Sequence, residues 1–182
     1  MSMLIDIGYG LAAAGYLPVL CFDRLARGKR RSGRAQRFGR VPARAGTKPC
    51  IWIHAVSVGE MNAIRLLVHR LAERNPHADL VLSATTETGL ARGRQIHPER
   101  IIFRFPLDFS WVIARTLRRI RPDLIVLTEL EVWYNLVTMA SRRGIAVAVV
   151  NGRFSGTSRR RFGWIRPIAR RMFSCLAWVG AQ

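Results

Sequence analysis

The chain has 182 residues, 49% of them hydrophobic, with 30 Lys and Arg against 11 Asp and Glu. This length suits one α/β domain, and the hydrophobic content excludes a disordered chain. The net charge of +19 fits nucleic acid, an anionic membrane or a phosphorylated substrate, so charge alone selects no partner. Three cysteines, Cys21, Cys50 and Cys175, lie far apart in apolar runs, and their spacing indicates neither a disulfide nor a metal cluster.

The first element in chain order is an apolar run from Leu4 to Phe22 with one charged residue, Asp6. A helix needs about 20 apolar residues to span a bilayer, so this run is of borderline length. Positive charge follows the run, unlike in a secretory signal, and predicts that the rest of the chain is cytoplasmic. We expect residues 1–27 to form a membrane anchor, spanning or interfacial, with a buried core helix as the alternative. The basic residues are Arg24, Arg27, Lys29, Arg30, Arg31 and Arg34.

Residues 28–49 are rich in Gly, Arg and Pro, which predicts a basic linker before a globular body over residues 50–182. In that body, short apolar runs alternate with helical patterns. The expected strands are Cys50–Ala55, Leu80–Ala84, Ile101–Phe105, Leu124–Leu127, Ile145–Val150 and Leu176–Val179. The expected helices are Glu60–Arg74, Glu87–Gln95, Trp111–Ile120, Val132–Arg143 and Ser158–Phe173. This order predicts a Rossmann-like α/β fold, a mostly parallel sheet with helices on both faces.

Function is expected in the loops that follow the strands, because ligands of such a sheet bind outside the carboxyl ends of its strands. Four of five such loops contain a carboxylate, in a protein with few carboxylates. The loops are Val56–Glu60, Thr85–Gly89, Pro106–Asp108, Thr128–Glu131 and Asn151–Ser155.

The segment Ser57-Val58-Gly59-Glu60 follows a buried strand and opens an amphipathic helix. Gly59 would allow a tight turn and the close approach of a substrate. The helix macrodipole favours an ionised carboxylate at Glu60, and such a carboxylate can accept a proton from an attacking sugar hydroxyl. The alternative is that Glu60 only caps the first turn of the helix.

A second acidic segment, Thr128–Asn135, follows the fourth predicted strand. If strand geometry continues, Glu129 and Glu131 share one face, where they can bind sugar hydroxyls or stabilise developing positive charge. Helix capping and pairing with arginine are the alternatives. Trp133 can stack on a sugar ring or fill the core, and His54, which ends the first strand, is expected to be a core histidine.

Three common motifs are absent from the sequence: GxGxxG, the Walker pattern GxxxxGK[ST] and GxSxG. A dinucleotide site, a P-loop and the simplest serine hydrolase therefore have no support.

Taken in this order, the segments resemble the N-terminal half of the bacterial 3-deoxy-D-manno-octulosonic acid (Kdo) transferases, which build the inner core attached to lipid A. The likeness covers essentially the whole chain, including the apolar start and Arg37-Phe38-Gly39. The matching segments are His54–Glu60, Thr85–Gly89, Pro106–Asp108, Glu129–Asn135 and Val150–Ser155.

This resemblance implies the two-domain GT-B architecture, no metal or other cofactor, and a place at the cytoplasmic side of the inner membrane. The implied reaction moves Kdo from CMP-Kdo to a glucosamine hydroxyl of a lipid A precursor, with inversion of the anomeric centre. A phosphorylated acceptor in an anionic leaflet would account for the positive charge. The implied catalytic residues are Glu60, as the base, and Glu129, which stabilises the transition state. The implied substrate-binding residues are Ser57, Gly59, Glu131, Asn135, Asn151 and Arg153.

The sequence departs from the family pattern in three places. Leu130 and Tyr134 replace Thr and Pro in the acidic motif, and Gly152 and Phe154 replace Ala and Leu in the last motif. The chain also ends at Gln182, near the end of the family's first domain. We therefore expect the nucleotide-sugar domain to be absent, no Kdo transfer by this chain alone, and a separately encoded donor domain as one explanation.

Two other functions stay open. The chain can be a non-catalytic, membrane-associated subunit that binds lipid A precursors, or a basic protein that binds nucleic acid. The arginines are spread along the chain and no nucleic-acid-binding module is recognisable, so we expect no nucleic-acid partner.

Overall fold

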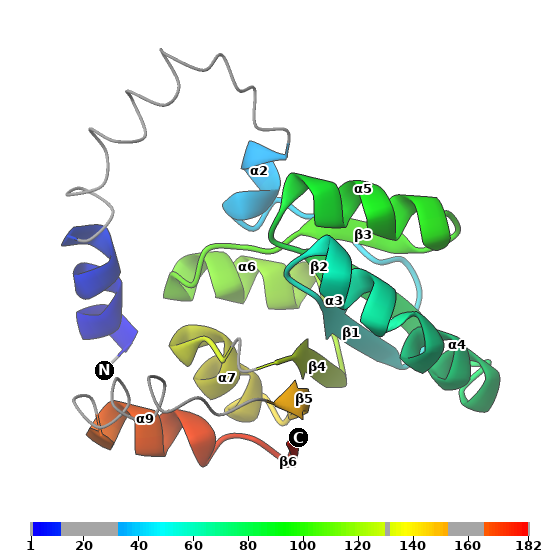
Figure 1. Cartoon of the computed structure of the whole chain (residues 1–182). Helices are drawn as coiled ribbons and strands as arrows, with labels where there is room; N and C mark the ends of the chain where they lie inside the picture. The colour runs from blue at the N-terminus through cyan, green and yellow to red at the C-terminus, as the bar shows by residue number, and fades with distance from the viewer. Residues whose placement is uncertain (1, 12–32, 130–131, 153–165, 182) are drawn as a thin grey trace.

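The sheet is parallel throughout. The computed structural model describes residues 2–11, 33–129, 132–152 and 166–181, which contain six strands in the order β3-β2-β1-β4-β5-β6 (Figure 1). The strands are β1 Cys50–His54, β2 Asp79–Ala84, β3 Ile101–Arg104, β4 Leu124–Thr128, β5 Ala146–Gly152 and β6 Trp178–Ala181. Every neighbouring pair is parallel, so the predicted parallel α/β sheet is confirmed.

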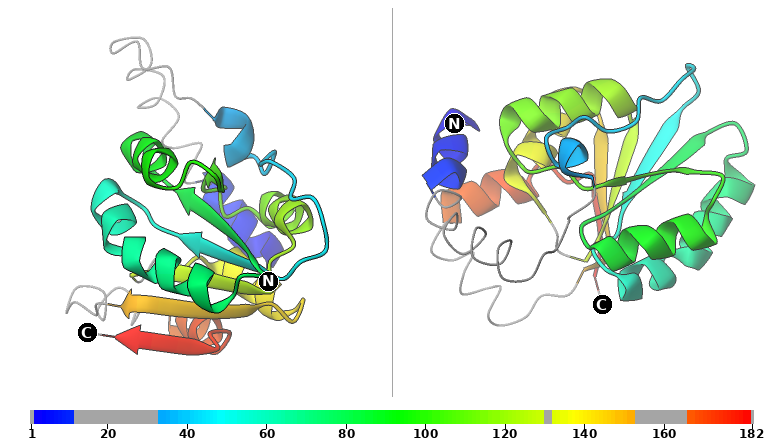
Figure 2. Two further views of the ribbon diagram at one scale, coloured as in Figure 1. Left: turned by 90° about the vertical axis from the view of Figure 1, so that its right-hand side faces the viewer. Right: turned by 90° about the horizontal axis from the view of Figure 1, so that it is seen from above.

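Helices cover both faces of this sheet (Figure 2). Side chains of α3, α4 and α5 pack on one face, and those of α6, α7 and α9 on the other. The bounds are α2 Arg34–Arg37, α3 Val58–Ala63, α4 Arg65–Arg74, α5 Glu87–Ile96, α6 Ser110–Ile120, α7 Tyr134–Ser141 and α9 Arg166–Phe173. The last expected helix, Ser158–Phe173, is thus described from Arg166 onward.

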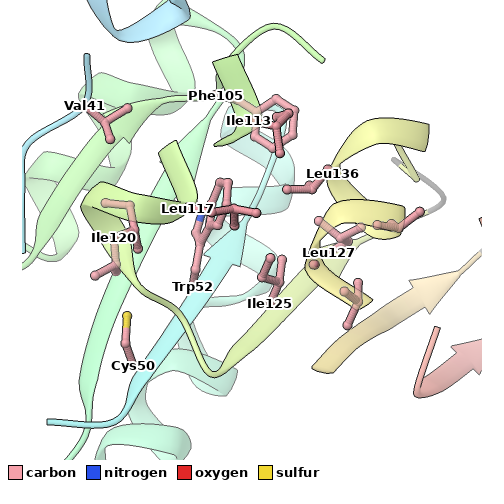
Figure 3. Close-up of a cluster of buried hydrophobic side chains, with 14 of the residues drawn as sticks. Val41, Cys50, Trp52, Phe105, Ile113, Leu117, Ile120, Ile125, Leu127 and Leu136 are labelled. Carbon is pink, nitrogen blue, oxygen red and sulfur yellow. The ribbon is translucent and has the colours of Figure 1, made fainter. Parts of the chain in front are cut away.

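The central strand β1 shows why the apolar runs lack polar alternation. All five of its residues are buried, because successive side chains enter opposite helical layers. Trp52 points into the same cluster as Leu117 of α6 and Leu136 of α7 (Figure 3). Ile51 and Ile53 pack into the layer of α3, α4 and α5 on the other face.

The first long helix differs from the expected one. We expected a single helix over Glu60–Arg74, but the chain forms α3 and α4 with a break at Ile64, whose φ and ψ are −80° and −3°. Ile64 and Val68 are buried in the core, as their spacing predicts. The apolar stripe therefore continues across the break, which explains why periodicity does not reveal it.

The expected linker is part of the packed body where the structure describes it, over residues 33–49. Val41 is fully buried, and Arg44 is 7% exposed. The Arg44 guanidinium donates to the carbonyl oxygens of Ile120 (2.9 Å) and Lys48 (2.8 Å) and to Oδ2 of Asp79 (2.8 Å). These contacts move the start of the globular body from residue 50 to within the stretch that we expected to be a linker.

At the N-terminus, residues 2–11 are helical and lie near α6 and α7 (Figure 1). Asp6 and Tyr9 face the body, where they contact Ser110 and Asp108. The other side of the helix exposes large apolar side chains, those of Met3, Leu4, Ile7 and Leu11. In the part of the chain that the structure describes, no helix combines the length and apolarity needed to cross a bilayer. Most of the expected anchor, residues 12–27, lies outside the described residues.

Candidate active site

The order of the strands changes direction between β1 and β4. From β1, the chain continues to β2 and β3 on one side, and β4, β5 and β6 lie on the other. In open parallel sheets, ligands bind at the carboxyl ends of the strands beside this switch point. Glu60 follows β1 and Glu129 follows β4. The two predicted catalytic carboxylates therefore follow the two strands that flank the switch point.

Glu60 sits in the first turn of α3 and is half-buried. Its Oε2 accepts hydrogen bonds from the Val56 N–H (2.9 Å) and the Thr128 hydroxyl (2.7 Å). Its Oε1 accepts from the Ser57 hydroxyl (3.1 Å), whose oxygen in turn accepts from the Glu60 N–H (3.4 Å). Ser57 and Glu60 thus form a reciprocal cap, which satisfies donors at the start of the helix. The structure thus shows the capping contacts, and the carboxylate is half-buried at the carboxyl end of β1; its role as a base stays a prediction.

The contact between Thr128 and Glu60 links the two strands of the switch point. Thr128 is the last residue of β4 and is 2% exposed. Its hydroxyl lies 2.7 Å from Glu60 and also 2.9 Å from the carbonyl oxygen of His54, the last residue of β1. Sequence reasoning missed this contact, because it depends on β1 and β4 being neighbours although 68 residues separate Glu60 from Thr128.

Glu129 and Asn151 both have left-handed backbone conformations. Their φ angles are 57° and 56°, and they lie at the ends of the neighbouring strands β4 and β5. The Glu129 N–H donates to the carbonyl oxygen of Val150 (2.9 Å), which holds the two strand ends together. Asn tolerates this conformation, but for Glu it costs roughly 1–3 kcal/mol, and such strain concentrates at functional sites. The left-handed conformation of Glu129 follows the end of strand β4 at Thr128, and Glu131 lies outside the described residues.

The loop after β2 is tied to the loop that precedes Glu60. Thr86 caps α5: its hydroxyl oxygen accepts from the Gly89 N–H (3.0 Å) and its hydroxyl donates to the carbonyl oxygen of Val56 (3.1 Å). A Cβ added at Gly89 would lie 2.9 Å from Oγ1 of Thr86 and 3.2 Å from the Val56 oxygen. Gly89 therefore allows α5 to approach the loop that carries the Glu60 contacts.

Gly59 has a different environment from the one that we expected. Its φ is not in the left-handed region, and an added Cβ would meet only Oγ of Ser57, at 3.8 Å. The turn itself thus does not require glycine, which corrects the first of the two reasons that we gave for it. The residue is exposed at the helix N-terminus beside Glu60, so the close approach of a substrate stays a prediction.

Asn135 belongs to a second polar network, one that is buried. Asp108 accepts hydrogen bonds from the N–H groups of Asn135 (2.9 Å) and Leu136 (2.8 Å), and so caps α7. Tyr9 donates to the same carboxylate (3.2 Å). The side-chain amide of Asn135 donates to Oδ1 of Asp6 (2.9 Å), and Asp6 also accepts from the Ser110 N–H (2.9 Å). This network joins the N-terminal helix to the starts of α6 and α7.

The fully buried position of Asn135 gives it a scaffold role in this structure, and its predicted contact with substrate stays a prediction. Burial raises the pKa of Asp108 to about 7, an effect larger than the lowering by the hydrogen bonds from Asn135 and Leu136. Burial also raises the pKa of Tyr9. The only sequence signal for this network was Asp6, the one charged residue in an otherwise apolar run, and the sequence does not show which residues it contacts.

The remaining predicted residues divide between the core, the surface and the part outside the described residues. His54 is fully buried, stacks on Phe105, and has its pKa lowered to about 3 by burial, which confirms the core interpretation. Trp133 lies against Phe105 and is 37% exposed, so it is neither a core residue nor a free platform. Glu131 and Arg153 lie outside the described residues.

Comparison with known proteins decides the family. The family described as "3-Deoxy-D-manno-octulosonic-acid transferase (kdotransferase)" matches residues 32–182. The chain belongs to the Kdo transferase family. It is 35% identical over 187 residues to a 3-deoxy-D-manno-octulosonic acid transferase of Bordetella pertussis, a match that covers 96% of this chain and 43% of that protein. The corresponding protein of Chlamydia pneumoniae is 32% identical over 161 residues, covering 87% of this chain and 37% of that protein.

The chain therefore spans about two-fifths of the length of the Kdo transferases that it matches. Among solved structures, the crystal structure of UDP-N-acetylglucosamine 2-epimerase is similar, with a TM-score of 0.51 and 13% sequence identity, over 74% of this chain and 42% of that one. At this identity the likeness concerns the fold alone. Family membership establishes the chain as the N-terminal domain of a glycosyltransferase family.

Proposed function

We propose that this chain supplies the acceptor side of a GT-B glycosyltransferase that moves Kdo from CMP-Kdo to a lipid A precursor. The observation that carries the proposal is the position of Glu60, a half-buried carboxylate in the first turn of a helix at the switch point of the sheet. Helix N-termini favour the ionised form of a carboxylate, which is the form that can accept a proton.

In the proposed step, Glu60 takes the proton of an acceptor hydroxyl as its oxygen attacks the anomeric carbon of Kdo. The new carbon–oxygen bond forms while the bond from that carbon to the phosphate oxygen of CMP breaks, so CMP leaves with the bonding electrons. Attack from the face opposite the leaving group inverts the anomeric centre. Glu129, held in a left-handed conformation beside the switch point, would stabilise the positive charge that develops on the sugar.

The residues that bind CMP are proposed to lie in a further domain, because this chain spans about two-fifths of its relatives. On this proposal the purified chain binds the acceptor but transfers no Kdo. Measurable transfer from CMP-Kdo by the chain alone would contradict it.

We also propose that the protein acts at the cytoplasmic surface of the inner membrane. The exposed apolar side of residues 2–11 supports this, together with a net charge of +19 that would attract anionic lipids. Vesicles rich in anionic phospholipid should carry the chain upward in a flotation gradient, and exchange of Leu4 and Ile7 for Glu should release it. Flotation that is unchanged by these two substitutions would oppose the proposal.

The catalytic role of Glu60 can be tested in a chimera in which this chain replaces the matching N-terminal part of the Bordetella pertussis transferase. Glu60→Gln removes the base and should lower the transfer rate at least about 100-fold, the lower end of what a general base contributes. The matched control is Glu73→Gln. Glu73 is exposed on α4, where it pairs with His69 and Arg70. Equal rates for the two variants would exclude Glu60 as the base.

The capping geometry favours one second candidate, a non-catalytic subunit that binds lipid A precursors. All three hydrogen bonds to the Glu60 carboxylate would serve a purely structural cap equally well. This candidate predicts that the unmodified chain and Glu60→Gln bind the acceptor equally and that the chimera is inactive with either. Transfer by the unmodified chimera would exclude it.

A further inference from the structure

The two oxygens of the Glu60 carboxylate do not have equal hydrogen bonding. A carboxylate oxygen has two lone pairs, and both of those on Oε2 have a donor, the Val56 N–H at 2.9 Å and the Thr128 hydroxyl at 2.7 Å. Oε1 has one donor, the Ser57 hydroxyl at 3.1 Å. One lone pair of Oε1 therefore stays available for an incoming proton.

We propose that Thr128 is a positioning residue that occupies Oε2 and so reserves Oε1 of Glu60 for the proton of the acceptor. The inference rests on the proposed function and specifies which oxygen of the base reacts and what holds it there. Thr128 is well suited to this, because it is buried at the end of β4 and its backbone is held by pairing with β5. A donor on a rigid strand fixes the carboxylate plane better than a donor on a mobile loop.

The single proton of the Thr128 hydroxyl has two acceptors within reach. While Glu60 is ionised, the charge-assisted bond to Oε2 is the stronger one, in keeping with its shorter distance. When Oε1 takes the proton of the acceptor, the charge on the carboxylate disappears. The hydroxyl can then turn to the carbonyl oxygen of His54, 2.9 Å away, without leaving a buried donor unsatisfied. The same hydroxyl thus supports both protonation states of the base.

The variant that tests this is Thr128→Val, which keeps the shape of the side chain and removes the donor. In the chimera with the Bordetella pertussis transferase, we expect kcat to fall about tenfold, a part of what a general base contributes, with little change in KM for the acceptor. Loss of a donor to the ionised carboxylate should also move the acid limb of the pH–rate profile to higher pH. Thr128→Ser keeps the hydroxyl and should restore both the rate and the profile.

The matched control is Thr116→Val, because Thr116 is also fully buried and donates one hydrogen bond, to the Val112 oxygen at 3.0 Å within α6. This control should leave the pH–rate profile in place. A Thr128→Val enzyme with the parent's kcat and profile, or a Thr128→Ser enzyme that is as slow as Thr128→Val, would overturn the inference. If Glu60→Gln also keeps full activity, the proposed function fails; if Glu60→Gln is inactive and Thr128→Val is not, only this inference fails.

A second measurement uses the chain by itself and needs no activity. Melting temperatures are compared for the parent, Thr128→Val, Glu60→Ala and the double variant. If the hydroxyl binds Glu60, the loss in the double variant should be smaller than the sum of the two single losses, because the shared bond is removed only once. Additive losses would show that the hydroxyl does not bind Glu60 and would overturn the inference.

Discussion

Two carboxylates at the carboxyl ends of the strands, Glu60 and Asp108, occupy similar positions in the sequence but differ in burial and in their contacts. Each follows a strand, β1 or β3, and each accepts a backbone hydrogen bond near the start of a helix: Glu60 from the Val56 N–H just before α3, and Asp108 from two N–H groups in the first turn of α7. Glu60 caps its own helix and is half-buried at the switch point. Asp108 caps a different helix, α7, and is buried beneath the N-terminal helix that carries Tyr9.

The local motif is similar at the two positions, so it does not distinguish a candidate catalytic carboxylate from a structural one. Burial and the number of contacts with other segments of the chain do. Asp108 accepts hydrogen bonds from three groups on two other segments of the chain, so its removal would leave these donors without an acceptor. The Glu60 contacts come from residues 56 and 57 and from Thr128 at the end of one neighbouring strand, and its side chain is half-buried. The comparison predicts that Asp108 matters most for stability and Glu60 for the reaction.

The largest expected effect on stability is that of Asp108→Ala. The N–H groups of Asn135 and Leu136 and the Tyr9 hydroxyl would lose their acceptor, and each unsatisfied buried donor costs about 1–3 kcal/mol. We expect the free energy of unfolding, measured by urea denaturation, to fall by about 3 kcal/mol or more. Glu60→Ala removes the cap with Ser57 and the acceptor of the Val56 N–H, but the Thr128 hydroxyl keeps the His54 oxygen as an acceptor, so the loss should be smaller, about 1–2 kcal/mol. Equal losses would break the comparison.

Much of the fold could be predicted because the strands are short, continuous apolar runs separated by helical periodicity. The start of the globular body and the break between α3 and α4 could not be predicted. Arg44 is buried by contacts with Asp79 and with the carbonyl oxygens of Ile120 and Arg121, all far away in sequence, so its Gly-, Arg- and Pro-rich surroundings indicate a linker. The break at Ile64 was also invisible, because the residue keeps its place in the apolar stripe.

The candidate site divides in the same way. Glu60 could be located from local sequence, because a buried strand followed by an amphipathic helix places the intervening carboxylate at the carboxyl end of the strand. Its partner Thr128 could not, since no local pattern reveals that β1 and β4 are neighbours. The left-handed conformation of Glu129 was also missed, because it depends on the bond from its N–H to Val150 on β5.

The second prediction concerns pH and follows from the burial of Asp108, which Asp6 and Tyr9 face. Its pKa is raised from 3.8 to about 7 in the folded chain. Between these values the folded state keeps a proton that the unfolded state has lost. The resulting stability is fully present below about pH 4 and is lost as the pH rises through about 7. The loss is at most about 1.4 kcal/mol per pH unit, the limit for one titrating group.

Urea denaturation at several pH values between 4 and 8 would measure this slope. Asp108→Asn cannot titrate, so the difference between the parent and this variant isolates Asp108 from other titrating groups such as His97, whose pKa burial lowers. If parent and variant have parallel pH profiles, Asp108 does not titrate in this range and its contrast with Glu60 weakens.

The smallest expected effect on stability, Gly59→Ala, sharpens the comparison because it separates folding from binding beside Glu60. An added Cβ would meet nothing closer than Oγ of Ser57 at 3.8 Å, so the free energy of unfolding should change by less than about 0.5 kcal/mol. Gly89→Ala is the matched control: its Cβ would lie 2.9 Å from Oγ1 of Thr86, and overpacking of this kind costs about 1–3 kcal/mol. If a substrate approaches Gly59 closely, Gly59→Ala should raise KM for the acceptor in the chimera while the protein stays fully folded. An unchanged KM would mean that the acceptor does not approach Gly59 closely, and the prediction of a substrate contact at this turn would be wrong.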